Sequence, residues 1–438
     1  LGMAKAQESG VHFLSVLGIV VLLCAVFGIF YLYFRNFAKE YLENSSILLM
    51  VAIIMVLTLL LSSVGIVKDI NPYILPLAVG TALLAVLLDV RFALLYNTLM
   101  SVLGVLIFKG DAYCLICLLA SGAFSAFIFT RGGVRHTLVF SALLQVILCG
   151  LLYFGVGVLE GVGNGAALLR GVYGLAAGGL TSVFVIGTLP IWEYAFDVTT
   201  PYKLLDLANP EQKLLKRLLI EAPGTYHHSL MVGNLAEAAC EATGGNGLLA
   251  KIGAYYHDIG KLRRPQYFKE NQYAENPHDK ITPILSASII ISHVKDGVEM
   301  ARQNRLPAAI CGIIASHHGN SKVAFFYHKA TIESEGEVEE AKFHYDGVLP
   351  HTKEEAIVML ADSVEAAVRS LSEKTEKEIR EMVHKIVQGK LSDGQLMESG
   401  LTLQDIDSAE NAFVRMFCGY FHSRIQYPEM KDTEKKTE

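Results

Sequence analysis

The sequence predicts an all-α protein in two parts, a seven-helix transmembrane domain followed by an all-helical soluble domain. Apolar residues make up 52% of the 438 residues and gather in long runs in the first half. Residues 1–200 hold nine Lys/Arg and nine Asp/Glu, so the whole net charge of −6 lies in the remainder. Twelve of the 14 histidines also follow residue 200. We therefore expect any chemistry to lie in the C-terminal part.

The apolar runs of the first part predict membrane spans, since crossing a bilayer takes about 20 helical residues. Asp89 and Arg91 form a polar turn between the third and fourth runs. The membrane domain then covers 12–197, and residues 1–11 form an extracellular stub or linker. The runs contain too little charge to indicate a transport pathway. The expected spans are about 12–34, 45–67, 72–88, 91–108, 112–130, 136–159 and 166–196.

Basic residues in the short loops predict the orientation of these spans. One set of alternate loops holds five basic residues and the other set holds three. The larger set is Arg35, Lys39, Arg91, Arg131 and Arg135. We assign this set to the cytoplasm, which leaves the N-terminus outside and the soluble domain inside. The expected protein is a multi-pass protein of the cell membrane, with the lipid bilayer as a partner.

The soluble part shows apolar residues at three- and four-residue spacing, which indicates helices. It forms an expected domain over 198–428. Strand-like alternation occurs only near Val323 to Tyr327, 329–352 reads as an exposed excursion, and 429–438 as a disordered tail. The expected helices are near 210–220, 226–242, 247–258, 283–303, 307–317, 353–370, 375–389 and 403–424.

Potential metal ligands recur through this helical domain. Imidazole and carboxylate ligands without thiolate favour Mn, Fe or Zn in a functional site over a structural zinc site. Asp362 lies in the apolar stretch "AIVMLADSVEAA", which predicts a buried carboxylate that needs a partner or a metal. A lone histidine is more often an ordinary core or surface residue, so each candidate keeps that alternative. The candidates are His227-His228, His257-Asp258, His293, His317-His318 and Asp362.

The order of His228, His257-Asp258 and Asp362 is similar to the HD superfamily of metal-dependent phosphohydrolases. Longer stretches, including "APGTYHHSLMVGNLAEAA", "GAYYHDIGKLRRPQYFKENQ", "SHHGN" and "IVMLADSVEAAVRSL", resemble the seven-transmembrane HD proteins of the PgpH type. Those proteins are bacterial cyclic di-AMP phosphodiesterases. They usually carry a large extracellular domain before the spans, and this sequence does not include one.

The resemblance implies a centre with two divalent transition-metal ions, Mn or Fe. It implies hydrolysis of cyclic di-AMP to the linear dinucleotide 5'-pApA by a hydroxide that the two metals activate. One metal would be held by His228, His257, Asp258 and Asp362. Asp258 would bridge to a second metal held by His293, His317 and His318. His227 would face elsewhere on its helix.

Further roles follow from the stretch around Asp258, which is expected to be catalytic as the bridge. Gly260 is expected to end a helix, so that Lys261 faces a bound phosphate as a catalytic and substrate-binding residue. Arg264 is a second candidate for substrate binding. For Lys261 the alternative is a cation that neutralises a helix C-terminus. A nucleic-acid polymer is not an expected partner, and a homodimer is one expected state.

Two other functions remain open at this point. An HD enzyme could act on cyclic di-GMP or guanosine tetraphosphate, although cyclic di-GMP enzymes typically carry His-His-Glu where this chain has His317-His318-Gly319. Alternatively, a membrane sensor could bind a nucleotide without turning it over. Such a sensor is expected to have lost a ligand, and here none of the set is missing.

Overall fold

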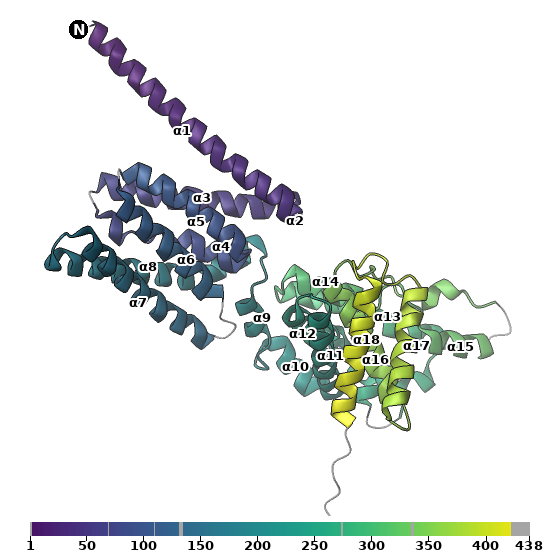
Figure 1. Ribbon diagram of the computed structural model, residues 1–438. Helices are drawn as coiled ribbons and strands as arrows, with labels where there is room; N and C mark the ends of the chain where they lie inside the picture. Colours follow the sequence, from purple (N-terminus) through teal and green to yellow (C-terminus); the bar gives the residue numbers. More distant parts are fainter. Residues whose placement is uncertain are drawn as a thin grey trace, which may run out of the picture. The chain divides into compact units, whose positions relative to one another are not determined.

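The computed structural model describes residues 2–68, 70–108, 110–130, 135–272, 275–333 and 337–421. Side chains of residues 2–16, 40, 66 and 135–137 lie outside this description, as does the expected tail at 429–438. Within the described residues the extended pairing is limited to an isolated bridge between Lys322 and His344, which confirms the all-α class. The chain forms two compact units, residues 1–205 and 206–438, and each is considered by itself (Figure 1).

Helices form almost all of unit 1. Six of them are long and apolar enough to cross a membrane. In chain order the helices of unit 1 are α1 (Gly2–Phe37), α2 (Lys39–Glu43), α3 (Ser45–Val67), the 3-10 helix η1 (Pro72–Ile74), α4 (Ala78–Leu87), α5 (Val90–Phe108), α6 (Ala112–Thr130), α7 (Arg135–Glu160) and α8 (Asn164–Phe196), and α9 (Pro201–Leu207) crosses the boundary between the units.

The third expected span, 72–88, differs from the prediction. Helix α4 begins only at Ala78, because Pro72 and Pro76 interrupt the run before it and lack the N–H that a helix needs. Its ten residues extend about 15 Å, half of a hydrocarbon core. Nine of the ten are nevertheless buried among the longer helices. Both its length and its burial therefore separate α4 from the other six.

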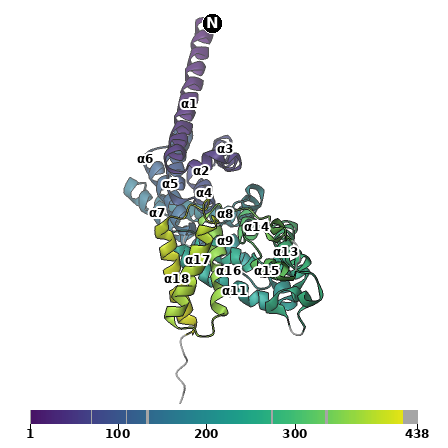
Figure 2. The same ribbon diagram turned by 90° about the vertical axis from the view of Figure 1, so that its right-hand side faces the viewer.

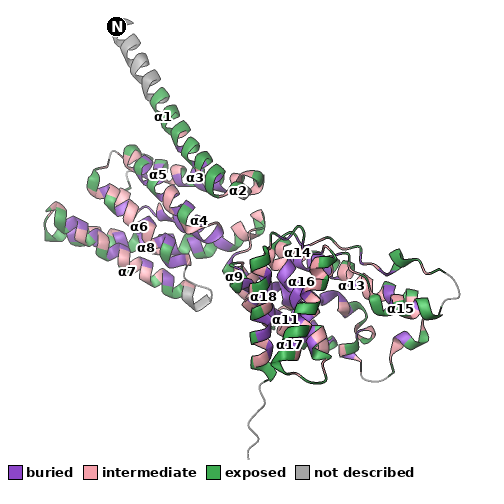
Figure 3. Cartoon of the chain, turned by 45° about the vertical axis from the view of Figure 1, so that its right-hand side comes forward, coloured by how far each residue is buried: buried purple, intermediate pink, exposed green. Residues whose placement is uncertain are grey.

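Helices α7 and α8 pack along one another as an antiparallel pair (Figure 1). Small residues allow the close approach: a Cβ added at Gly174 would overlap the carbonyl of Cys149, and one at Gly178 would crowd Gln145. Such small-residue contacts are typical of helices packed in membranes. By contrast, α1 is largely exposed over its described part (Figure 3). An apolar, exposed helix of this kind suits contact with lipid.

Unit 2 is a helical domain built around α16 (Lys353–Arg369). Residues 356–362 of this helix are all buried, and Figure 3 shows α16 among the surrounding helices. Helices α17 and α18 lie side by side (Figure 2). The other helices are α10 (Lys213–Glu221), α11 (Pro223–Ala242), α12 (Gly247–Tyr256), α13 (Pro283–Gln303), α14 (Ala308–Ser316), α15 (Ala324–Glu333), α17 (Glu376–Ser392) and α18 (Leu403–Phe421). Short 3-10 helices are η2 (Ile259–Arg263), η3 (Pro265–Tyr267), η4 (Lys269–Asn271), η5 (Pro277–Lys280) and η6 (Glu340–Phe343).

Side-chain caps set the starts of several helices in unit 2. Thr352 accepts a hydrogen bond from the Glu355 backbone N–H at the start of α16. Thr375 and Glu378 form a reciprocal capping box at the start of α17. These caps place both starts within one residue of the predicted 353 and 375. All eight helices expected in this part are present.

The segment after α14 differs in part from the prediction, although residues 331–333 and 339–342 are exposed as expected. The strand-like residues near Val323 belong mostly to α15, because Phe326 and Ala330 recur one helical turn apart and are both buried. The expected exposed excursion at 329–352 contains Phe343 and Tyr345, which are also buried. Aromatic residues of this segment pack against α13 in a small separate core.

Candidate metal centre

The ends of two helices and the faces of three others meet at one point of unit 2. His257 follows the last residue of α12, and Asp258 then leads into η2. His317 and His318 follow α14 in the same way. His228 lies on α11, His293 on α13 and Asp362 on α16. All seven residues predicted as metal ligands therefore come together.

Two groups of three ligand-type residues can be distinguished within this cluster. The first is His228, His257 and Asp362, whose ligand atoms lie within 4.8 Å of one another. Nε2 of His228 lies 3.0 Å from Oδ1 of Asp362, and Nε2 of His257 lies 3.7 Å from the same oxygen. All three residues are buried.

The second group is His293, His317 and His318, again with ligand atoms within 4.8 Å of one another. Nε2 of His293 and Nε2 of His317 are only 3.1 Å apart. His318 is the most exposed of the seven, with 22% of its side chain accessible, and its ring stacks on Tyr345 at 4.4 Å. Solvent can thus reach this group past His318.

Asp258 lies between the two groups with one carboxylate oxygen toward each. Its Oδ2 lies 3.2 Å from Nε2 of His257 and 3.7 Å from Nε2 of His228. Its Oδ1 lies 3.3 Å from Nε2 of His293 and 3.8 Å from Nε2 of His317. A carboxylate in this position can bind two cations at once.

Backbone carbonyls select the ring nitrogen that faces the centre. Nδ1 of His257, His293 and His317 lies 2.6, 2.5 and 2.7 Å from a carbonyl oxygen three residues earlier. A carbonyl only accepts, so each Nδ1 carries a hydrogen and each Nε2 is the nitrogen left to bind a cation. Nε2 of His257 and Oδ1 of Asp258 are also buried without a hydrogen-bond partner. This donor set fits divalent cations.

The histidines of the cluster differ in charge. Burial alone would lower the pKa of His228, but hydrogen bonds to Asp362 and Glu365 raise it to about 9. Burial also acts on His257, yet the negative charge of Asp258 raises its pKa to about 10. Burial, reinforced by the positive charge of His257, lowers the pKa of His317 to about 3. Protons on His228 and His257 thus compensate the carboxylates in the absence of a cation.

Lys261 lies beside the bridging carboxylate. Its Nζ is 2.6 Å from Oδ2 of Asp258 and 2.9 Å from Oε1 of Glu270. Glu270 also accepts a hydrogen bond from the Thr225 hydroxyl at 3.0 Å. The charge of Lys261 is therefore compensated by two carboxylates. Arg264, the other predicted substrate contact, is exposed and donates to the Ser292 hydroxyl at 3.3 Å.

Gly260 has a different role from the one predicted. Helix α12 ends at Tyr256, and Gly260 lies inside the following 3-10 helix rather than at a helix end. A Cβ at this position would overlap the carbonyl oxygen of His293. Gly260 is therefore required for close packing of η2 on α13, which brings Asp258 and His293 together.

Comparison with known proteins accounts for both units of the chain. Residues 13–200 match the family described as "7TM receptor with intracellular HD hydrolase", and residues 225–367 match the HD domain family. The cyclic-di-AMP phosphodiesterase PgpH of Bacillus subtilis is 40% identical over 403 residues, which are 88% of this chain and 56% of that protein. The chain belongs to this seven-transmembrane HD family.

Two further relatives come from Listeria monocytogenes. Its cyclic-di-AMP phosphodiesterase PgpH is 39% identical over 82% of this chain and 51% of its own length. The crystal structure of its HD domain in complex with cyclic di-AMP covers 99% of that domain and 49% of this chain, with 48% identity and a TM-score of 0.47. The chain spans about half the length of the curated relatives that it matches.

Glu365 is a residue of the HD domain that the sequence analysis missed. Its Oε2 accepts the hydrogen of His228 Nδ1 at 2.7 Å, so that Nε2 of His228 faces Asp362. Its spacing gave a signal, because Glu365 follows Asp362 by three residues on one helix and shares its face. A carboxylate behind a ligand histidine typically fixes the ring and raises its basicity.

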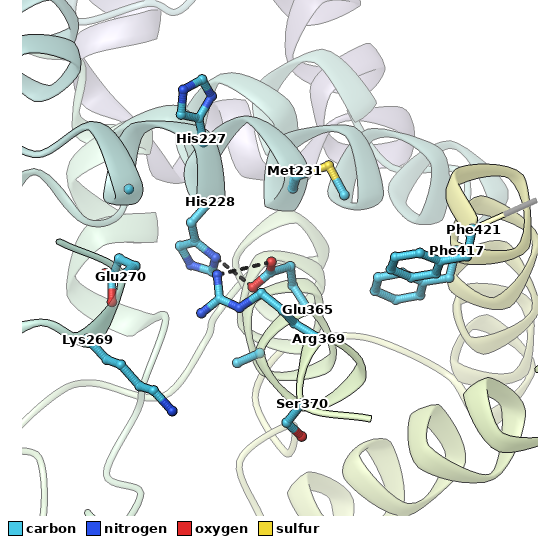
Figure 4. A pocket seen from close by; sticks show the side chains of 12 residues that line it. His227, His228, Met231, Lys269, Glu270, Glu365, Arg369, Ser370, Phe417 and Phe421 are labelled. Carbon is cyan, nitrogen blue, oxygen red and sulfur yellow. Dashed lines mark hydrogen bonds and ion pairs between the residues drawn. The ribbon is translucent and has the colours of Figure 1, made fainter. Parts of the chain in front are cut away.

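A cavity of about 890 Å³ opens beside the metal centre of the HD domain. Figure 4 shows His228 pointing from α11 toward Glu365, with Phe417 and Phe421 stacked farther along the cavity. The lining holds charges of both signs, Lys269 and Arg369 beside Glu270 and Glu365. His227, excluded from the ligand set by its position on the helix, also lines this cavity and not the cluster.

Proposed function

We propose that this chain is a membrane-anchored phosphodiesterase that uses two metal ions to hydrolyse cyclic di-AMP to 5'-pApA. The observation that carries the proposal is the position of Asp258, with one oxygen toward each of two histidine groups. The names of the relatives support the substrate. No ligand of the implied set has been replaced, which argues against a sensor without turnover.

The ligand sets follow from the two groups of side chains. We assign one ion, Mn or Fe, to His228, His257, Asp258 and Asp362. We assign the other to Asp258 and to the histidines at 293, 317 and 318. When bound, such ions supply a nucleophile at neutral pH and stabilise charge on phosphoryl oxygens. The backbone carbonyls and Glu365 keep the rings oriented for this purpose.

The reaction breaks one of the two phosphodiester bonds. The oxygen of water bonds to phosphorus, the bond between phosphorus and O3' breaks, and the O3' oxygen leaves as a hydroxyl. The product is a linear dinucleotide with a 5'-phosphate. The cavity beside His228 and Glu365 offers room for the nucleotide that does not react.

For Lys261 we propose a contact to a substrate phosphate and a part in catalysis, and for Arg264 a contact to the substrate. Lys261 holds Asp258 through its 2.6 Å ion pair, which keeps the bridging carboxylate ionised and oriented. Burial opposes this, but the charges of His257 and Lys261 keep the pKa of Asp258 well below its usual range. Arg264 would attract the substrate from the surface.

The proposal extends to the membrane and to assembly. We propose that the membrane domain covers 12–197 and the HD domain covers 198–428. The excess of basic residues in one set of loops supports a cytoplasmic HD domain and an extracellular N-terminus. A homodimer is a further proposal, which light scattering of the purified protein in detergent would test.

The experiment uses the full chain purified in detergent and freed of metal by a chelator. Mn²⁺ or Fe²⁺ is restored, and cyclic di-AMP, cyclic di-GMP and guanosine tetraphosphate are each added in separate reactions. We expect metal-dependent conversion of cyclic di-AMP to 5'-pApA, and loss of this activity in Asp258→Ala. Conversion of a different nucleotide in place of cyclic di-AMP would overturn the proposed substrate assignment. Binding of cyclic di-AMP without turnover in the metal-loaded protein would overturn the proposal that the chain is an enzyme.

A further inference from the structure

Lys390, near the end of α17, is a positively charged residue outside the proposed metal ligands and substrate contacts. Its Nζ donates a hydrogen bond to the Ser321 hydroxyl at 2.8 Å, and its side chain is only partly accessible. Among the described residues it forms no ion pair, although Asp393 lies three positions farther along the chain. A partly buried ammonium group without a carboxylate partner is unfavourable unless an anion approaches it.

Hydrogen bonds connect this lysine to the metal centre. Ser321 follows the ligand His318 by three residues. Between them, Asn320 both donates its backbone N–H to Gln395 and accepts from the Gln395 side chain, at 3.3 and 2.6 Å. Gly319 has a φ of +54° and no room for a Cβ against Gln395. The turn that carries His318 is thus bound to the segment that follows Lys390.

The carboxylate of Asp362, a proposed metal ligand, acts electrostatically on Lys390. Burial lowers the pKa of Lys390, while the negative charges of Asp362 and Asp393 oppose the decrease. Asp362 thus acts on the ammonium group without forming a described ion pair with it. Ser321 binds Lys390 and follows His318 by three residues, so this hydrogen bond places Lys390 on the His318 side of the centre.

The two lysines of the site differ in their partners. Lys261 lies within 3 Å of both Asp258 and Glu270, so its charge is already compensated. Lys390 donates its hydrogen bond to a neutral hydroxyl and forms no ion pair among the described residues. An incoming phosphodiester would therefore gain more from Lys390, because its charge is available to the ligand.

We propose that Lys390 contacts the substrate, donating an N–H to a non-bridging oxygen of the phosphodiester on the His318 side of the centre. This inference rests on the proposed phosphodiesterase function and adds a residue to it. Ser321 holds the lysine side chain in place, and the turn at Gly319 carries Ser321. The proposed partner of the Lys390 ammonium group is thus a phosphoryl oxygen of the substrate.

The matched variants are Lys390→Met, which removes the charge but keeps an unbranched apolar stem, and Lys390→Arg, which keeps the charge. Loss of a charge-assisted hydrogen bond corresponds to roughly a 10- to 100-fold decrease in kcat/KM for Lys390→Met. We expect Lys390→Arg to retain most of the kcat/KM of the unaltered protein. Lys385→Ala, an exposed change on the same helix, serves as the control and should match the unaltered protein.

Two readouts separate a substrate contact from a structural role. Metal content, measured by mass spectrometry, should be the same in all variants. The affinity of the metal-loaded protein for inorganic phosphate, measured by calorimetry, should fall by roughly 10-fold in Lys390→Met. Phosphate binding does not depend on turnover, so it tests Lys390 even if cyclic di-AMP proves not to be the substrate.

Each result bears on the inference. Unchanged kcat/KM and phosphate affinity in Lys390→Met would overturn it. Loss of metal from Lys390→Met, or failure of Lys390→Arg to restore phosphate affinity, would also overturn it, because either result indicates a structural role. Weakened phosphate binding at constant metal content, restored by arginine, would support it. Inactivity of the unaltered protein toward cyclic di-AMP would instead count against the proposed function.

Discussion

Nδ1 of His228 lies 2.7 Å from Oε2 of Glu365, and both side chains are buried. Since the carboxylate accepts the hydrogen of Nδ1, the opposite nitrogen of the ring is the one near Asp362 and Asp258. The orientation of one proposed ligand therefore depends on a residue outside the ligand set. Four predictions follow from this relationship and the contacts around it.

Replacing Glu365 by Gln should weaken the metal centre without removing a ligand. The amide can still bond to Nδ1 but has no charge to stabilise the ring, so metal affinity or activity should fall roughly 10- to 100-fold. Calorimetric titration with Mn²⁺ measures the affinity. Glu410→Gln is the matched control, because Glu410 lies 3.0 Å from Nδ1 of His384, an exposed histidine outside the metal cluster. Equal effects of the two changes would contradict this role of Glu365.

Metal binding should strengthen as the pH rises above 7. The pKa values of His228 and His257 are raised to about 9 and about 10, so both rings hold a proton at neutral pH in the absence of metal. A ligand nitrogen must release that proton, so binding at pH 7.5 should liberate about two protons. Calorimetry in buffers of different ionisation enthalpy measures this number. A pH-independent affinity between 6.5 and 9 would exclude the two protonated rings.

The Asp258→Asn change should lower the metal content of the protein more than the Asp362→Asn change. Asp258 faces both histidine groups, whereas its counterpart Asp362 lies mainly beside His228 and His257. We expect Asp258→Asn to lose both metals, because the charge shared between two cations is missing. Metal analysis of the purified proteins tests this, and a full complement of two ions in Asp258→Asn would disprove the bridge.

Gly260→Ala should destabilise the HD domain by about 1–3 kcal/mol, because the added methyl group overlaps the carbonyl of His293. Gly389→Ala is a suitable comparison, since it lies within α17 and a Cβ there meets no atom within 4 Å. That change should stabilise the helix by about 0.5–1 kcal/mol. Denaturant unfolding of the HD domain without metal measures both. A neutral Gly260→Ala would show that η2 can move away from α13.

Much of the fold was predictable from local patterns. The helical spacing of apolar residues predicted eight of the helices in unit 2. The caps at Thr352 and Thr375 were not used in that prediction, although they depend only on neighbours in the chain. Local patterns failed where packing decides. Residues around Phe326 alternate as in a strand but form a helix, because the helix buries Phe326 against Phe343. The prolines at 72 and 76 limited α4 although its run is as apolar as the others.

The metal site shows the same division. Residue type identified His257, Asp258 and Asp362, because imidazole and carboxylate are the ligands that such ions need, and no folding is required to recognise them. The interactions around them arise only in the folded chain. Glu365 and His228 are 137 positions apart, and Lys390 and Ser321 are 69 apart.

The sequence by itself therefore determined the all-α class, the order of membrane and HD domains, and the identity of the candidate ligands. Only the tertiary structure decided which nitrogen of each ligand histidine faces the centre, and that Lys261 is paired with two carboxylates while Lys390 donates to a hydroxyl. The physical reason is distance. Hydrogen bonds and ion pairs act over a few ångströms, so their partners are set by how distant helices pack.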